Sequence, residues 1–91
     1  MLRGAAHRGS REGMLQLARC FDAGVGVGTD RAEALRWCRR AAKRGLTEAQ
    51  FVLGVWCAEE EKLDRAAHWY RKAAAQGSES AAQNLQLLNA Q

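Results

Sequence analysis

The sequence contains no proline and no long run of apolar residues. Proline interrupts helices, so its absence, together with abundant alanine, favours helix along almost the whole chain. No apolar stretch approaches the roughly 20 residues that a membrane-spanning helix needs, so we expect no membrane partner. At 91 residues the chain is expected to form one small all-α domain with a modest core.

Targeting signals and paired cysteines are also absent. The N-terminus has no apolar region of the kind that a secretory signal contains. The three cysteines form no Cys-x-x-Cys pair, which argues against a disulfide framework and against a zinc site. We therefore expect a cytoplasmic protein, or a periplasmic or exported one if the N-terminus is truncated.

The chain also lacks the residue combinations that carry catalysis. Its two histidines, His7 and His68, have no carboxylate or cysteine at ligand spacing, so we expect no metal. No serine stands in a Gly-x-Ser-x-Gly setting. The glycine-rich residues 24–28 precede Thr29 and Asp30 rather than the Lys-Ser or Lys-Thr of a phosphate-binding loop. The sequence therefore predicts a structural turn there, no cofactor and no enzyme activity.

What the sequence does contain is a repeat. Residues 37–45 return as residues 69–77, and a fainter copy stands at residues 1–9, at spacings of 32 and 36. Periods of roughly 20–50 residues are typical of solenoids and other repeat arrays. A unit of this kind cannot bury its apolar side alone and must stack on a neighbour. The repeat predicts a surface that binds something rather than a pocket that reacts.

Helix boundaries are visible within the first copy. Ser10 is expected to cap a helix over residues 10–22. Asp30 begins the next helix, with Glu33 three residues later as the partner in a capping box. Gly45 is expected to end that helix in the left-handed conformation.

The second copy follows the same plan. Thr47 is expected to cap a helix with Gln50 as its partner, and the charged residues 59–62 form the connection to the next helix. Gly77 should end that helix, and Ser78 should cap a last one.

Small residues in the repeat predict close packing. Gly54 is expected to admit a neighbouring helix where a Cβ atom would clash. Cys38 and Cys57 occupy slots that the other copy fills with apolar residues, so buried, inert thiols are expected. Cys20 is matched by Trp56, which leaves open a reactive or dimer-linking role.

These motifs together resemble the Sel-one-like repeat, a relative of the tetratricopeptide repeat that forms α/α solenoids. The resemblance rests on Leu17, Ala18, Phe21, Gly24, Gly26, Asp30, Ala34, Trp37, Ala41, Ala42 and Gly45 in the first unit, and on Ala49, Leu53, Gly54, Ala66, Trp69, Tyr70, Ala73, Ala74 and Gly77 in the second. It implies a single repeat domain over residues 1–91: the end of a preceding repeat helix (1–9), repeat 1 (10–45), repeat 2 (46–77) and a capping helix (78–91).

The resemblance also implies a function as a protein-interaction module or adaptor. In such solenoids the first helix of each pair lines a concave groove that holds a partner segment. The implied groove positions are Leu15, Arg19, Asp22, Phe51, Val55, Ala58, Gln83 and Leu87. Arg19 could anchor an anionic group of the partner. Alternatively, the apolar members pack on the chain's own termini or on a second copy.

Two other functions stay open. A homodimer, or a longer parent array, could cover the apolar end formed by Met1, Leu2, Ala5 and Ala6. Residues 1–45 carry a net charge of +6 and residues 46–91 one of −2. Nucleic acid could therefore bind the basic half, but no aromatic residue interleaves with its charges, so a basic solvated surface is the simpler interpretation. The basic residues concerned are Arg31, Arg36, Arg39, Arg40, Lys43 and Arg44.

Overall fold

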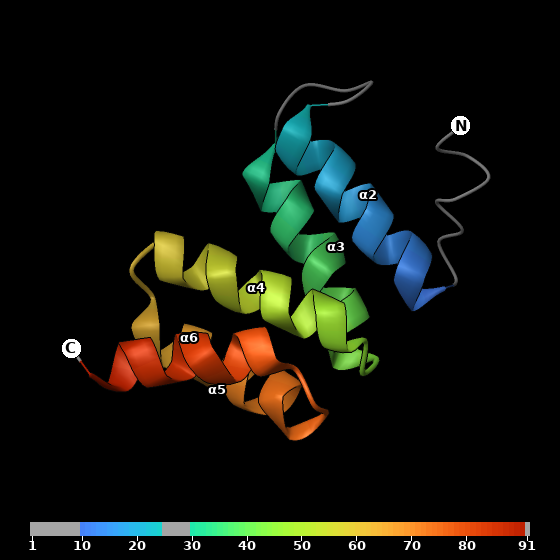
Figure 1. Cartoon of the computed structure of the whole chain (residues 1–91). Coiled ribbons are helices and arrows are strands. Elements are labelled where there is room, and N and C mark those ends of the chain that lie inside the picture. Colours follow the sequence, from blue (N-terminus) through green and yellow to red (C-terminus); the bar gives the residue numbers. More distant parts are fainter. Residues whose placement is uncertain (1–9, 25–29, 91) are drawn as a thin grey trace. The chain divides into compact units, whose positions relative to one another are not determined.

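A computed structural model describes residues 10–24 and 30–90 of the chain. This part contains five helices and no strand, so the predicted all-α fold is confirmed. The helices are α2 (Arg11–Ala23), α3 (Arg31–Lys43), α4 (Thr47–Glu59), α5 (Leu63–Ala75) and α6 (Glu79–Asn89). None of these helices is long and apolar enough to cross a membrane. The chain divides into two compact units, Met1–Leu46 and Thr47–Gln91 (Figure 1).

The first unit is a hairpin in which α2 and α3 lie side by side (Figure 1). The buried side of α3 carries small residues, Ala34, Cys38, Ala41 and Ala42, each at most 1% exposed. Small side chains let two helix backbones approach closely, so this hairpin packs tightly without large aromatic residues in its centre.

Side-chain caps begin both helices of the first unit. The Ser10 hydroxyl accepts a hydrogen bond from the Gly13 amide (2.9 Å), and the Asp30 carboxylate accepts one from the Glu33 amide (3.1 Å). Both predicted caps are confirmed. The Asp30 amide, however, donates to the Phe21 carbonyl (2.9 Å) at the end of α2 rather than to the side chain of Glu33. The capping box is therefore formed in one direction only, because the hairpin itself satisfies that donor.

The second unit is organised around α4 and Tyr70. No residue of α4 between Ala49 and Ala58 is exposed. Tyr70 of α5 is 3% exposed, and its ring fits against Gly54: a Cβ atom there would lie 2.6 Å from two ring carbons. The predicted close approach at Gly54 is confirmed. Asn84 of α6 donates a hydrogen bond to the Tyr70 hydroxyl (3.3 Å), so one side chain links three helices.

The start of α4 differs from the expectation. Thr47 is the first residue of the helix itself, so its predicted position before the helix as the cap is wrong. Gln50 is 5% exposed, and its side-chain carbonyl accepts a hydrogen bond from the Gln76 amide group (2.8 Å). A contact across 26 residues, from the start of α4 to the end of α5, has thus replaced the expected local one.

Three of the described helices end with the same left-handed turn. The residues in this conformation are Gly45 after α3 (φ 91°), Glu61 after α4 (φ 61°) and Gly77 after α5 (φ 103°). In each, the next amide donates to the carbonyl five residues back: Leu46 to Ala41 (3.2 Å), Lys62 to Cys57 (2.9 Å) and Ser78 to Ala73 (3.1 Å). These are Schellman motifs, and the expected roles of both glycines are confirmed.

Replacing Glu61 by glycine is expected to stabilise the protein by about 1 kcal/mol, because a non-glycine residue at this φ carries steric strain. The midpoint of urea unfolding should rise with an unchanged slope. Glu60→Gly is the matched control, because it adds the same flexibility one residue earlier, where φ is not positive. An unchanged or lower midpoint for Glu61→Gly would show that the turn is not strained.

Candidate functional site

The expected groove residues of the first unit differ in exposure. Leu15 is 4% exposed, so it offers almost no surface to a partner in this structure. Arg19 is exposed on α2. Asp22 is half-buried, and its carboxylate accepts a hydrogen bond from Arg31 of α3 (2.8 Å), an ion pair within the hairpin. Arg19 is therefore the member of this set that is open to solvent.

In the second unit the expected residues lie on two helices that contact each other. Phe51, Val55 and Ala58 follow one another at helical spacing on α4 and are half-buried. Gln83 and Leu87 are exposed on α6. A shift of one repeat, 32 residues, carries Phe51 to Gln83 and Val55 to Leu87. We refer to these five residues as the unit-2 strip.

Leu87 is the most exposed apolar member of the strip. This residue is 65% exposed, more than any other large hydrophobic residue in the part of the chain that the structure describes. The buried side of α6 is built from Ala81, with Leu85 and Leu88 half-buried beside it. Leu87 lies off that side and so contributes little to the packing of α6.

Tyr70 supports the strip from within. Its ring lies 6.1 Å from the ring of Phe51, at an interplanar angle of 39°. Burial raises the pKa of the Tyr70 hydroxyl above its ordinary value, although the hydrogen bond from Asn84 partly offsets this. At neutral pH the hydroxyl is therefore uncharged, and Tyr70 acts as a fixed support for Phe51 rather than as a reactive group.

A second feature is basic. The residues of α3 that point to solvent include Arg36, Arg39, Arg40 and Lys43, which we call the α3 basic stripe. The guanidinium of Arg40 lies 4.8 Å from the centre of the Trp37 ring, at cation–π distance. All four are among the basic residues named from the sequence, and the structure places them exposed on one helix.

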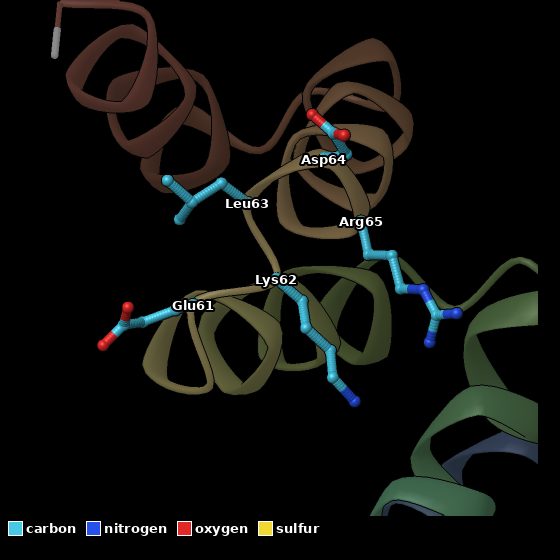
Figure 2. A pocket seen from close by; sticks show the side chains of 5 residues that line it. All are labelled: Glu61, Lys62, Leu63, Asp64 and Arg65. Atoms are coloured by element: carbon cyan, nitrogen blue, oxygen red, sulfur yellow. The ribbon is translucent and has the colours of Figure 1, made fainter.

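A shallow hollow lies at the turn between α4 and α5. Figure 2 shows that Glu61 and Leu63 point to one side of it, whereas Lys62 and Arg65 point to the other. The nitrogen of Lys62 lies 3.4 Å from the Glu60 carboxylate. The side chains around this hollow diverge and carry both signs of charge, so they do not converge on a ligand. No pattern in the sequence predicted this feature.

The remaining candidates are cysteines and residues near the N-terminus. Cys38 and Cys57 are 0% and 6% exposed, which confirms that they are buried, and Cys20 is 9% exposed. Within the described ranges no three His, Cys, Asp or Glu side chains form a group that could hold a metal ion. His7, the expected repeat end at residues 1–9 and most of the glycine-rich turn lie outside the described residues.

Comparison with known proteins identifies the repeat. The family model of the Sel1 repeat matches residues 11–46 and 47–78. A curated relative, chitin synthase regulatory factor 4 of Schizosaccharomyces pombe, is 33% identical over 88 residues. The match covers 96% of this chain and 14% of the relative, so the chain spans about one seventh of that protein.

Two solved structures are similar in fold. A Sel1 repeat protein from Oxalobacter formigenes superposes with a TM-score of 0.80 at 37% identity, over 93% of this chain and 67% of that one. A protective antigen of uropathogenic Escherichia coli with an SLR fold gives 0.79 at 36% identity, over 92% of this chain and 19% of that one. With both repeats matched and the predicted fold class confirmed, the chain belongs to the Sel1 repeat family.

Proposed function

We propose that this chain binds a segment of a partner protein on the unit-2 strip, with the side chain of Leu87 inserted among apolar side chains of that segment. Sel1 repeats are commonly protein–protein interaction modules, and proteins built from them are generally non-enzymatic scaffolds. The curated relative is named as a regulatory factor, which is in keeping with a module that binds rather than reacts.

The observation that carries the proposal is the exposure of Leu87. A leucine at 65% exposure leaves most of its apolar area in water, and burying such a side chain in a complex contributes up to about 1.5–3 kcal/mol. Phe51 and Val55 extend the apolar surface along α4 and are half-buried, so they are held in place before a partner arrives. Preorganised side chains lose little entropy on binding, which favours affinity.

The polar member of the unit-2 strip would orient the bound segment. Gln83 occupies the α6 position that corresponds to Phe51 and has both a hydrogen-bond donor and an acceptor. In the first unit Arg19, exposed on α2, is proposed to bind a carboxylate of a partner separately from the unit-2 strip. The segment expected on the strip is apolar, with a polar group that can form a hydrogen bond with Gln83.

Leu87→Gln is expected to weaken binding of a segment selected on the wild-type protein by about tenfold, because it removes the apolar contact. A peptide library displayed on phage supplies the segment, and fluorescence anisotropy measures the affinity. Ala82→Gln is the matched control: residue 82 is also exposed on α6 but lies roughly 140° around the helix from Leu87. Equal affinity of the selected peptide for both variants would refute the assignment.

Phe51→Ala is a second test variant in the same binding experiment. It should weaken binding of the same peptide while the circular dichroism spectrum stays helical, because Phe51 is only half-buried. Unfolding by this change would count against a binding role for Phe51.

Light scattering over a concentration series tests the alternative that the chain self-associates. A wild-type dimer that Leu87→Gln converts to a monomer would make a second copy the occupant of the strip.

A further inference from the structure

We propose that the α3 basic stripe is a second interaction surface, which binds an acidic helical segment of a partner protein. The stripe belongs to the first unit, whereas the apolar contact proposed above is made by the second. The two proposals rest on different residues and can fail separately. The proposal for the stripe rests on four exposed basic residues of α3: Arg36, Arg39, Arg40 and Lys43.

The stripe is continuous and lies opposite the buried side of its helix. At 100° per residue its four members span roughly 100° of the circumference, and Ala34, Cys38 and Ala41 occupy the other side. From residue 36 to residue 43 the stripe is about 10 Å long, or two helical turns. Its basic side chains are thus neighbours at three- and four-residue spacing.

Few acidic groups compensate this charge. The acidic residue of α3 is Glu33, and its carboxylate lies 3.5 Å from the guanidinium of Arg36. Within the described residues, Arg39, Arg40 and Lys43 form no ion pair. Like charges three or four residues apart destabilise a helix by about 0.2–0.5 kcal/mol for each pair. The stripe contains four such pairs, and an anion bound on it would relieve their mutual repulsion.

The helix dipole stabilises only two of the four basic residues. Cations in the last turn of a helix are favourable, and Arg40 and Lys43 stand there. Arg36 and Arg39 lie earlier, where the dipole gives them no benefit. The corresponding positions of α5 are His68, Arg71, Lys72 and Ala75. The repeat therefore does not require four basic residues, and the full stripe is particular to α3.

The dimensions favour an acidic helix over nucleic acid. Glutamates at three- and four-residue spacing on a partner helix repeat every 5–6 Å, which matches the spacing along the stripe. Arginine pairs with carboxylates through two parallel hydrogen bonds, so three arginines suit such a partner. Non-specific nucleic-acid binding depends on a longer basic track and on aromatic rings that stack with bases. Arg40 lies over the ring of Trp37, so that ring is not open for stacking on this side.

Fluorescence anisotropy with a labelled helical peptide tests the proposal. The probe is about 14 residues long and carries glutamate at positions i, i+3, i+4 and i+7, and its control has glutamine at those positions. Wild type should bind the glutamate peptide at least tenfold more tightly than the control. Raising the salt from about 50 mM to about 200 mM should weaken this binding, because exposed charges are screened.

Arg39→Gln with Lys43→Gln should weaken binding of the glutamate peptide by about tenfold. The unfolding midpoint of this variant should be unchanged or higher, because like-charge repulsion is removed, so loss of binding cannot be attributed to loss of fold. Arg71→Gln with Lys72→Gln is the matched control on α5 and should bind as wild type does. Leu87→Gln should also bind normally, which separates this surface from the unit-2 strip.

Three results would overturn the proposal. The first is equal affinity for the glutamate and glutamine peptides. The second is undiminished binding by the Arg39→Gln, Lys43→Gln variant. The third is tighter binding of a labelled oligothymidylate of similar length than of the glutamate peptide, which would assign the stripe to nucleic acid instead.

Discussion

Replacing Gly54 by alanine is expected to destabilise the protein by about 1–3 kcal/mol. The added Cβ atom would lie 2.6 Å from two carbons of the Tyr70 ring, closer than carbon atoms can approach. The ring cannot move away at low cost, because it is 3% exposed and its hydroxyl accepts a hydrogen bond from Asn84. Relief of the clash must therefore separate α4 from α5 or break the link to α6.

Whether Gly54→Ala lowers or raises the free energy of unfolding is a strict test of the close contact. In an unobstructed helix interior, glycine to alanine stabilises by roughly 0.5–1 kcal/mol, so helix propensity alone predicts the opposite result. A double-mutant cycle measures this interaction by urea unfolding of wild type, Gly54→Ala, Tyr70→Leu and the double variant. Gly54→Ala should cost less in the Tyr70→Leu background than in the wild-type background, because leucine has no ring to meet the added Cβ atom. A stabilising effect of Gly54→Ala in the wild-type background would show that the two helices are not in close contact at Gly54.

The sequence predicted the local features of the fold correctly where one short segment determines them. Ser10, Asp30 and Ser78 each cap a helix, because a short oxygen-bearing side chain can reach an amide three residues ahead. Gly45 and Gly77 end helices because glycine takes positive φ without strain. None of these predictions needed knowledge of the remainder of the chain.

The features that the sequence did not predict depend on distant residues or lack a residue-type signal. Gln50 has the spacing of a capping-box partner, but burial brings it to Gln76 instead. Glu61 takes a positive φ although glutamate rarely does so. The connection from α4 to α5 is short, and the chain must reverse there. The repeat itself held a hint, since the other helix ends of this type carry glycine.

The candidate site was predictable as a set of positions but not as a surface. The repeat pattern places Val55 and Leu87 at equivalent positions, and the sequence shows that both are apolar. It cannot show that Leu87 is 65% exposed while Leu15 is 4% exposed, because burial depends on which helices cover each position. For the same reason Asp22 could not be recognised as the partner of Arg31 across the hairpin.

Replacing Gly77 by valine is expected to cost about 2 kcal/mol, because a β-branched residue is strongly disfavoured at a φ of 103°. A Cβ atom at this position meets nothing within 4 Å, so the cost arises in the backbone and not from a clash. The turn also joins two helices. The Ser78 amide donates a hydrogen bond to the Ala73 carbonyl at the end of α5. The Ser78 hydroxyl accepts one from the Ala81 amide (3.2 Å) at the start of α6. Strain at Gly77 therefore weakens both helices at once.

Gly77→Asn is the matched control, because asparagine tolerates positive φ better than valine does and should cost clearly less. The midpoint of urea unfolding should fall in the order wild type, Gly77→Asn, Gly77→Val, with an unchanged slope. Equal midpoints for the two variants would mean that the turn adopts another conformation when glycine is removed. In that case Ser78 could not both end α5 and cap α6. The position of α6, and with it the exposure of Leu87, would then depend on packing against Tyr70 rather than on the turn.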